Sequence, residues 1–263
     1  MSYLFDHLDE VGDILSASPF GLVTDVDGTI SPIAPTPQQA IVSPMCRRYL
    51  SMLSDKLDLV AVISGRPLLD VMTMVGIEGL VYVGNHGLEV WNKGIPELPA
   101  RIDRFITVIA QALESLERRI DMDGLMFENK GLTASIHYRN ANDTDAARKK
   151  ILEEGKSLPQ INDLRITEGR MVVELRPDID INKGSALKAL IKKHNLAGVM
   201  YIGDDVTDID AFNVVHESGI KGIAIAVASE ETPPRLIESA DFTIQGVTDV
   251  ERLLEWLAQS AGR

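Results

Sequence analysis

Two aspartates, Asp25 and Asp27, stand two residues apart directly after the apolar run at residues 20–23. A strand would point both carboxylates the same way, and Gly28 allows the backbone to turn sharply after them. Two carboxylates so arranged can act as a nucleophile and a general acid/base. An isolated Asp-x-Asp is also common in solvated turns, so this interpretation depends on other groups at neighbouring strand ends.

A second acidic cluster, Asp204, Asp205 and Asp208, follows another apolar run and leads into an expected helix. A helix N-terminus, where acids suit the dipole, accounts for Asp208 but poorly for the other two. A hard cation with oxygen ligands explains them better, and Mg²⁺ is usual where a phosphate completes the coordination shell. With Asp25 and Asp27 alongside, the cation would neutralise charge that repels an incoming phosphate.

Two further segments could hold a phosphoryl group. Ser64 and Arg66 follow a third apolar run and precede a helix, offering a hydroxyl and backbone N–H groups at a positive helix end. An ordinary N-cap explains Ser64 as well. Lys183 begins a later helix and could place its ammonium on the phosphate, although a surface lysine would look identical in sequence.

The elements that would position these groups are short β-branched apolar runs alternating with amphipathic helices. This pattern predicts a doubly wound α/β fold, with a parallel sheet covered on both faces. Ligands of such sheets bind beyond the carboxyl ends of the strands, so the polar groups that follow four strands should converge in one cleft. The expected strands are 20–24, 57–63, 80–83, 199–202, 223–227 and 242–244, and the expected helices are 43–53, 67–75, 183–193, 208–215 and 250–258.

The middle of the chain has a different pattern, α-β-β-α-β-β, which would interrupt the parallel sheet. It predicts a smaller inserted α+β cap domain at 98–178, between core segments 1–97 and 179–263. An insertion joined by two chain crossings is a natural lid that excludes water and selects the substrate. Its expected elements are a helix at 102–119, a hairpin of 125–128 and 132–138, a helix at 144–156, and a hairpin of 164–167 and 171–175.

Composition excludes several classes of function. Among 263 residues the formal net charge is −13, which opposes binding to nucleic acid or an anionic membrane. The single cysteine, Cys46, rules out an internal disulfide and a cysteine-rich metal site. No run approaches the roughly 20 apolar residues of a membrane span, and the first residues lack a secretory pattern. We expect a cytoplasmic protein with a small anionic substrate, and a monomer, although the sequence does not fix the oligomeric state.

The four polar segments, in this order, resemble those of the haloacid dehalogenase superfamily of aspartyl phosphatases and phosphomutases. The resemblance implies that Asp25 is the nucleophile, that Asp27 is the acid/base, and that Ser64 and Lys183 hold the phosphoryl group. It also implies an Mg²⁺ site composed of acidic residues: Asp25, Asp204 and the Asp27 carbonyl as ligands, with Asp205 and Asp208 in support.

Longer segments are similar to those of the trehalose-6-phosphate phosphatase family, through nearly the whole chain. They are residues 25–33, 84–89, 128–130, 137–139, 174–177 and 203–212, with Ile209 as one departure from the family pattern. This resemblance implies hydrolysis of trehalose 6-phosphate through an aspartyl-phosphate.

In the expected cap, strand alternation places Glu174 and Arg176 on the face opposite Val173, and Glu128 and Lys130 on one face of their own strand. A solvated surface would show the same pattern. With the family resemblance, Glu128, Lys130 and Glu174 become the candidates for binding the disaccharide. Arg66 and His86 of the core are weaker candidates, because Arg66 could pair with a core acid and a loop histidine is more often structural.

Other functions fit parts of the same pattern. A phosphatase for another sugar phosphate, such as sucrose phosphate or mannosyl-phosphoglycerate, would use the same core with a related cap, and a phosphomutase is a more distant alternative. A sensor that binds a sugar phosphate without turnover is a different class of protein. Such a sensor would tolerate loss of Asp25, Asp27 or Asp204, and all three are present.

Overall fold

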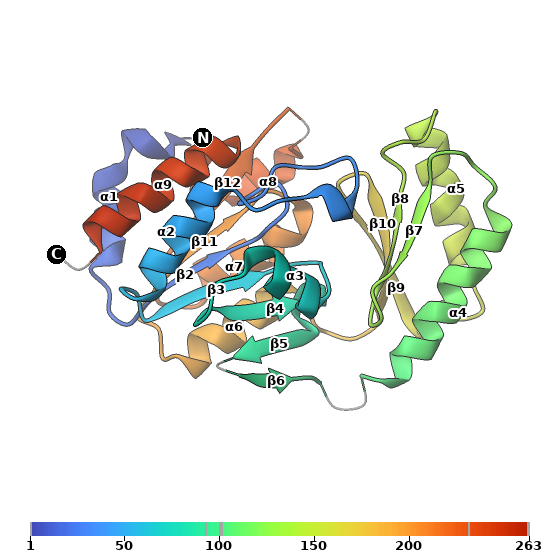
Figure 1. Ribbon diagram of the computed structural model, residues 1–263, viewed down its shortest axis with the longest axis horizontal. Helices are drawn as coiled ribbons and strands as arrows, with labels where there is room; N and C mark the ends of the chain where they lie inside the picture. Colours follow the sequence, from blue (N-terminus) through green and yellow to red (C-terminus); the bar gives the residue numbers. More distant parts are fainter. Residues whose placement is uncertain (1, 93, 100–101, 231, 262–263) are drawn as a thin grey trace. The chain divides into compact units, whose positions relative to one another are not determined.

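The computed structural model describes residues 2–92, 94–99, 102–230 and 232–261 (Figure 1). The chain divides into two compact units, one of Met1–Glu97 with Ile181–Arg263 and the other of Leu98–Asp180. We call them the first and second units. Within the described residues, no helix is both long and apolar enough to cross a bilayer.

The sheet of the first unit has parallel pairing through most of its width and an antiparallel edge. All neighbouring strands pair in parallel except at one edge, where the last three strands pair antiparallel. The central strands are buried along their length, as their continuous apolar sequences predict. In spatial order the strands are β1 (Ser2–Tyr3), β13 (Phe242–Gln245), β12 (Lys221–Ala228), β11 (Gly198–Gly203), β2 (Phe20–Thr24), β3 (Leu59–Ile63), β4 (Val81–Gly84), β5 (Glu89–Asn92) and β6 (Ile95–Glu97).

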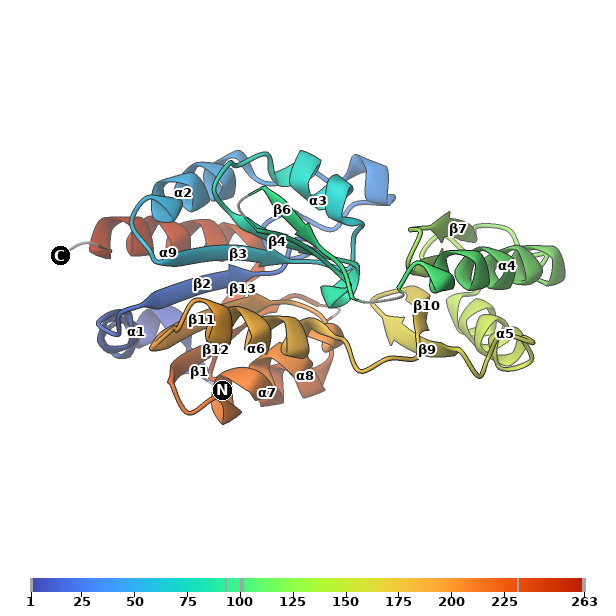
Figure 2. The same ribbon diagram turned by 90° about the horizontal axis from the view of Figure 1, so that it is seen from below.

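Helices cover both faces of this sheet, because neighbouring residues of each central strand point to opposite sides. Leu22 and Val62 pack into one apolar cluster with one set of helices, whereas Val23 and Ile63 pack into a second cluster with the other set. The first set is α1 (Leu8–Leu15), α2 (Pro44–Ser54), α3 (Leu68–Val75) and α9 (Gly246–Ser260), and the second is α6 (Lys183–Lys193), α7 (Ile209–Glu217) and α8 (Pro234–Ser239). Figure 2 shows α2 and α9 on one side of the sheet and α6, α7 and α8 on the other.

The doubly wound α/β prediction is confirmed, with additions at the edges of the sheet. The expected strands and helices of the first unit are present, with ends shifted by a few residues. The sequence did not predict α1, α8, β1, β5 or β6. Strand β5 escaped notice because its residues Glu89, Val90, Trp91 and Asn92 are mostly half-buried and have no continuous apolar run.

The second unit is an antiparallel sheet with two helices against one face. Apolar side chains of the two helices, such as Leu116 and Ile151, share a buried cluster with Ile136, Val173 and Leu175 of the sheet. Pairing of residues 134–137 with 172–175 joins the two expected hairpins. Its helices are α4 (Arg104–Arg119) and α5 (Thr144–Lys156), and its strands, in spatial order, are β7 (Met126–Asn129), β8 (Ala134–His137), β10 (Val172–Pro177) and β9 (Leu164–Gly169).

Candidate active site

Three of the predicted carboxylates meet at the carboxyl ends of β2 and β11, which are adjacent strands. The Asp25 N–H donates to the Ile202 carbonyl of β11 at 2.9 Å, which continues the pairing of the two strands. One carboxylate oxygen from each of Asp25, Asp204 and Asp208 lies within 4.8 Å of the others, and all three residues are buried. The predicted convergence of these carboxylates is therefore present in the structure.

Lys183 joins this cluster from the first residue of α6. Its Nζ lies 3.0 Å from Asp25 Oδ1 and 2.8 Å from Asp208 Oδ1, and the residue is only 2% exposed. The start of α6 is fixed by a capping box between Asn182 and Ser185. The structure thus excludes the surface-lysine alternative and places the ammonium against the predicted nucleophile.

Asp208 organises the cluster by accepting hydrogen bonds. Besides Lys183, its Oδ1 accepts from the Tyr201 hydroxyl at 2.7 Å, and its Oδ2 accepts from the N–H groups of Asp204 at 3.1 Å and Asp205 at 3.0 Å. Asp205 and Asp208 form a reciprocal capping box, so the helix-start explanation also covers Asp205. Tyr201 was not predicted, although a tyrosine hydroxyl in a buried strand requires a polar partner.

Burial gives these groups unusual proton affinities. Burial raises the pKa of Asp25 to about 7; the Asp208 and Asp27 carboxylates add to the rise, and Lys183 opposes it. Burial and the Asp25 carboxylate also hold the pKa of Asp204 well above its usual range. Although burial lowers the pKa of Lys183, the Asp208 and Asp25 carboxylates outweigh it and raise that pKa overall.

The donor set of this cluster suits a bound cation. Three buried carboxyl groups lie together, and the Lys183 ammonium pairs with two of them, Asp25 and Asp208. A divalent cation would favour the ionised forms that burial disfavours. The four hydrogen bonds to Asp208 occupy much of its accepting capacity, so Asp25 and Asp204 are the carboxylates best able to coordinate an ion. Oxygen-only donors fit a hard divalent cation.

Gly28 provides the space that Asp204 occupies. Its φ is +81°, a left-handed conformation that favours glycine, and a β-carbon there would overlap the Asp204 carboxylate. Thr29 Oγ1 also donates to Asp204 Oδ1 at 3.4 Å. Gly28 therefore allows the backbone to turn after Asp27 and leaves room for the Asp204 carboxylate to approach it closely.

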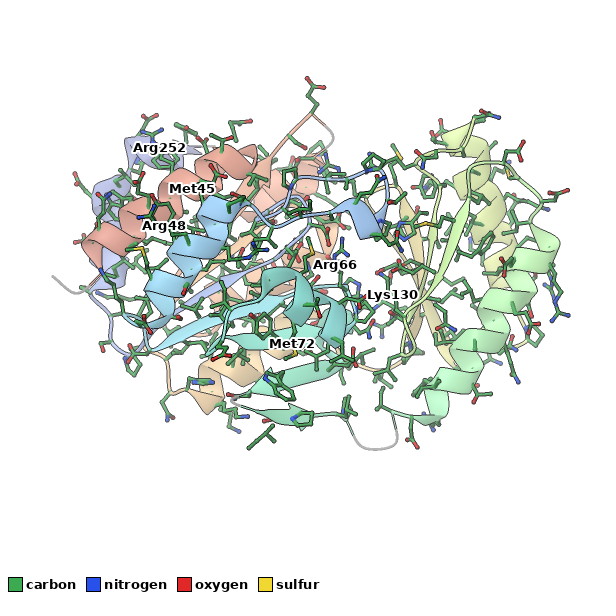
Figure 3. All side chains as sticks on the ribbon, in the orientation of Figure 1. Met45, Arg48, Arg66, Met72, Lys130 and Arg252 are labelled. Atoms are coloured by element: carbon green, nitrogen blue, oxygen red, sulfur yellow. The ribbon has the colours of Figure 1, made fainter. Side chains whose placement is uncertain are left out.

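Asp27 is held by Arg66 in a two-point ion pair. Arg66 Nε lies 2.7 Å from Asp27 Oδ2, and Nη2 lies 2.7 Å from Oδ1. A third donor, Nη1, reaches the Pro37 carbonyl at 3.0 Å. Arg66, labelled in Figure 3, thus orients the predicted acid/base, and the structure shows the pairing with a core acid that the sequence left open.

Ser64 directly follows β3, beside this pair. It is 1% exposed, and its Oγ accepts from the Arg66 N–H at 3.2 Å. His86 lies behind the same loop, because a β-carbon on Gly65 would be 2.6 Å from the His86 imidazole. The structure brings Ser64, Arg66 and His86 together and places the imidazole against the backbone of the loop.

The second unit carries a polar cluster on the sheet face opposite α4 and α5. Lys130 Nζ lies 3.3 Å from Glu174 Oε1 and 4.0 Å from Glu128 Oε2. Ser135 donates to Glu174 at 3.1 Å, and His137 Nε2 lies 2.9 Å from Glu128 Oε2. Glu128, Ser135 and Glu174 form one row across β7, β8 and β10. The predicted trio is therefore assembled, with Ser135 and His137 as members that the sequence analysis did not list; Lys130 is labelled in Figure 3.

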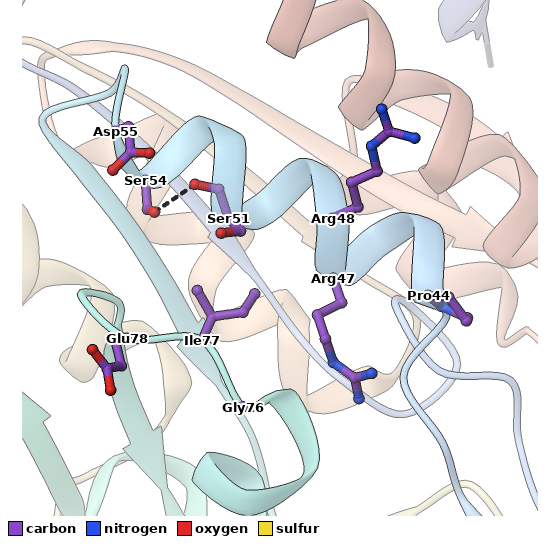
Figure 4. A pocket seen from close by; sticks show the side chains of 9 residues that line it. All are labelled: Pro44, Arg47, Arg48, Ser51, Ser54, Asp55, Gly76, Ile77 and Glu78. Carbon is purple, nitrogen blue, oxygen red and sulfur yellow. Dashed lines mark hydrogen bonds between the residues drawn. The ribbon is translucent and has the colours of Figure 1, made fainter.

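A surface pocket of about 450 Å³ lies elsewhere on the first unit, along α2 and the loop after α3 (Figure 4). Arg47 and Arg48 point to different sides of α2, and Arg47 donates to the carbonyls of Val75 and Met74, both at 2.9 Å. Its basic side chain therefore stabilises the end of α3. None of the residues lining this pocket belongs to the acidic cluster.

Known proteins resemble the chain over almost its whole length. A family model described as trehalose-phosphatase matches residues 23–246. The trehalose-phosphate phosphatase of Mycobacterium leprae (strain TN) is 34% identical, over 98% of this chain and 62% of that protein. That of Mycobacterium bovis (strain BCG / Pasteur 1173P2) is 35% identical, over 98% of this chain and 67% of that protein. The chain thus spans about two thirds of the length of these relatives.

The solved C-terminal domain of Candida albicans trehalose-6-phosphate phosphatase has the same fold. It superposes with a TM-score of 0.80 at 21% identity, covering 96% of this chain and 97% of that domain. This similarity confirms the predicted doubly wound α/β fold, which the chain shares with that domain. Because the family model spans Asp25, Lys183 and Asp204, and both relatives align with nearly all of the chain, the chain belongs to the trehalose-phosphatase family.

Proposed function

We propose that this protein hydrolyses trehalose 6-phosphate to trehalose and inorganic phosphate, with Mg²⁺ as cofactor. The observation that carries the proposal is the buried contact of Lys183 with Asp25, beside Asp204, at adjacent strand ends. A solvated turn does not need a buried ammonium on its carboxylate. A carboxylate nucleophile that must approach an anionic phosphate does need such an ammonium, because the positive charge offsets the repulsion between the two anions. Family membership supports the choice of substrate.

In the first step, an Asp25 carboxylate oxygen attacks phosphorus, and the bond from phosphorus to the sugar oxygen breaks. Asp27, which enters this step protonated and with one oxygen released from Arg66, donates its proton to that oxygen, so trehalose leaves as a neutral alcohol and Asp25 becomes an acyl phosphate. In the second step, Asp27 takes a proton from water, whose oxygen attacks phosphorus and releases phosphate from Asp25. Lys183 and the Ser64 hydroxyl hold the phosphoryl oxygens, so positioning and electrostatics supply most of the rate.

The cation site in this proposal consists of Asp25, Asp204 and the Asp27 carbonyl, supported by Asp205 and Asp208. When bound, Mg²⁺ would neutralise the carboxylates and polarise the phosphoryl group. Asp208 supports the site by fixing Lys183 and the backbone of Asp204 and Asp205. The acidic residues thus divide into those that coordinate and those that hold their neighbours in place.

The second unit, in this proposal, is the cap that selects the disaccharide. Its polar cluster offers the carboxylates of Glu128 and Glu174 and the ammonium of Lys130, with most of their surface already buried. Ionised partners make the stronger hydrogen bonds to hydroxyl groups, so this cluster suits a sugar.

Phosphate release from a panel of sugar phosphates, with and without Mg²⁺, tests the proposed function. We expect release that depends on Mg²⁺ and is fastest with trehalose 6-phosphate. Faster turnover of sucrose phosphate or mannosyl-phosphoglycerate would support the proposed mechanism but would show that trehalose 6-phosphate is not the preferred substrate. Binding of a sugar phosphate without any release would identify a sensor instead.

Replacing Glu128 with Ala should affect the disaccharide phosphate selectively. The change removes a carboxylate that accepts from His137 and lies near Lys130, but it leaves the acidic cluster of the first unit intact. We expect kcat/KM for trehalose 6-phosphate to fall at least tenfold, and that for 4-nitrophenyl phosphate to change less than twofold. Equal losses with both substrates would remove this cluster from substrate selection. Glu153→Ala, on the exposed surface of α5, is the matched control.

Replacing Gly28 with Ala should weaken Mg²⁺ binding by tenfold or more, because the new methyl group would displace the Asp204 carboxylate. Isothermal titration with Mg²⁺ measures the affinity directly. Gly79→Ala is the control for backbone strain, since Gly79 has a φ of +86° and no heavy atom within 4 Å of an added β-carbon. If both variants bind Mg²⁺ equally well, Asp204 does not ligate the ion from the position seen in the structure.

A further inference from the structure

The connection between β4 and β5 is an unusual turn behind the loop that carries Ser64. Asn85, His86 and Gly87 have successive φ values of 46°, 58° and 114°, and the first two are not glycine. Asn85 and His86 are buried. Such conformations persist only where the surroundings hold them, and they concentrate at functional sites.

The backbone of this turn is hydrogen-bonded to the Ser64 loop. The His86 N–H donates to the Ser64 carbonyl at 2.9 Å, and the Asn85 N–H donates to the Arg66 carbonyl at 2.8 Å. The His86 ring packs against Gly65 between these two bonds. The turn therefore fixes the backbone on both sides of Gly65.

Glu89, the first residue of β5, ties the turn to the helix that follows the loop. Its Oε2 accepts from Asn85 Nδ2 at 2.6 Å and from the Leu68 N–H at 3.0 Å. Leu68 begins α3, whose N-cap residue, Pro67, supplies no side-chain cap. One oxygen of Glu89 thus accepts hydrogen bonds from both the turn and the first N–H of α3, a group that has no partner within the helix.

The other side of the turn lies against the residues that lead to Lys183. A β-carbon on Gly87 would be 2.9 Å from the backbone oxygen of Asn182 and 3.1 Å from Ile181 Cγ2. Asn182 caps α6, and Lys183 is the next residue. The turn is therefore packed between the two segments that carry Ser64 and Lys183.

We propose that Glu89 is a positioning residue for the phosphoryl site, acting through Asn85 and Leu68 on the loop of Ser64 and Arg66. The proposal rests on the proposed function, because Ser64 would hold the phosphoryl group and Arg66 orients Asp27. Without the Glu89 carboxylate, the turn loses its side-chain link to α3. Ser64 Oγ and the Asp27 carboxylate then lose their fixed positions relative to Asp25. The alternative is that Glu89 is only a helix cap that contributes to stability.

Variants at Glu89 separate these two roles. Because Asn85 and Leu68 donate to the same oxygen, the single amide oxygen of Glu89→Gln can accept both bonds, whereas Glu89→Ala removes both. We expect Glu89→Ala to lower kcat/KM at least tenfold for trehalose 6-phosphate and for 4-nitrophenyl phosphate alike, since the phosphoryl group is common to both. Glu89→Gln should remain within threefold of the unmodified protein. Glu97→Ala, in the neighbouring strand β6, removes an exposed carboxylate that pairs with Lys193 of α6, and it should leave activity unchanged.

A helix cap alone predicts a different result. In that case Glu89→Ala would lower the melting temperature but leave kcat/KM within threefold at a temperature where the variant is folded, and the proposal would be overturned. Asn85→Asp provides a second variant, because it places an oxygen where Nδ2 donates to Glu89. It should reproduce the loss seen with Glu89→Ala, and full activity of Asn85→Asp would also contradict the proposal.

Binding of inorganic phosphate keeps this test separate from that of the proposed function. If the unmodified protein releases phosphate from no substrate, the proposed function fails, and calorimetric titration with phosphate in the presence of Mg²⁺ still measures the site. We then expect Glu89→Ala to bind phosphate at least fivefold more weakly than Glu89→Gln and the unmodified protein. Equal affinities, or no phosphate binding by the unmodified protein, would refute the positioning role.

Discussion

Replacing Asp25 with Asn should lower phosphate release by a factor of about 10⁴ or more, while the protein stays folded. The amide has nearly the shape of the carboxylate but is not a nucleophile towards phosphorus. Steady-state assays with trehalose 6-phosphate and saturating Mg²⁺ measure the loss. Asp70→Asn, on the exposed surface of α3, is the matched control and should retain full activity. Residual activity within tenfold of the unmodified protein would exclude Asp25 as the nucleophile.

The same substitution should stabilise the metal-free protein at neutral pH. Burial raises the pKa of Asp25 from 3.8 to about 7, so the folded state keeps a proton that the unfolded state has lost between these values. The stability of the unmodified protein therefore falls as the pH rises through this range, whereas the amide introduced by Asp25→Asn does not titrate. Urea unfolding with a chelator present should show no advantage of Asp25→Asn near pH 4 and the full advantage above pH 7. Equal stabilities at pH 8 would contradict this account.

Replacing Lys183 with Met should have the largest effect on stability, a loss of about 3–5 kcal/mol in the free energy of unfolding. The methionine fills similar space but leaves Asp25 and Asp208 without the ammonium that lies 3.0 Å and 2.8 Å from them. Phosphate release should fall as well, because the phosphoryl group loses the same cation. Lys188→Met, at an exposed position of α6, is the control. A loss below about 1 kcal/mol would show that hydrogen bonds alone satisfy these carboxylates.

Combining the two substitutions measures the coupling of the pair. Once Asp25 is replaced by Asn, Lys183→Met leaves one fewer buried carboxylate unpaired, so its effect on stability should be smaller than in the unmodified protein. A double-mutant cycle from urea unfolding gives this difference. Strict additivity would indicate that the ammonium is held by Asp208 alone.

The convergence of the acidic segments could be predicted because parallel strands place their carboxyl ends at one edge of a sheet. Asp25 and Asp204 follow continuous apolar runs, and such runs identify buried strands without knowledge of the partners. Lys183 was a weaker prediction, since its burial depends on the packing of α6 against α7. A β-carbon on Gly184 would overlap the Asp210 backbone, and nothing in the local sequence reveals that contact.

Other parts of the site depend on contacts that a sequence pattern does not encode. The pairing of Arg66 with Asp27 joins residues 39 positions apart, and the bond from Tyr201 to Asp208 requires a particular side chain on an apolar strand. Glu89 lies in a half-buried antiparallel strand with no marked periodicity. Arrangements of this kind emerge only when the backbone is in place, because they depend on the direction of individual side chains.

The boundaries of the second unit have a consequence for how this family can diversify. The first junction, between Glu97 and Leu98, follows an edge strand, and the second, between Asp180 and Ile181, precedes the capping box of α6. Lys183 is thus anchored by its own helix, downstream of both junctions. Under the proposed function, an insertion bounded in this way can be exchanged, or can accumulate substitutions, without redesign of the hydrolytic chemistry. Substrate range and catalytic power would then evolve as separate modules within one polypeptide.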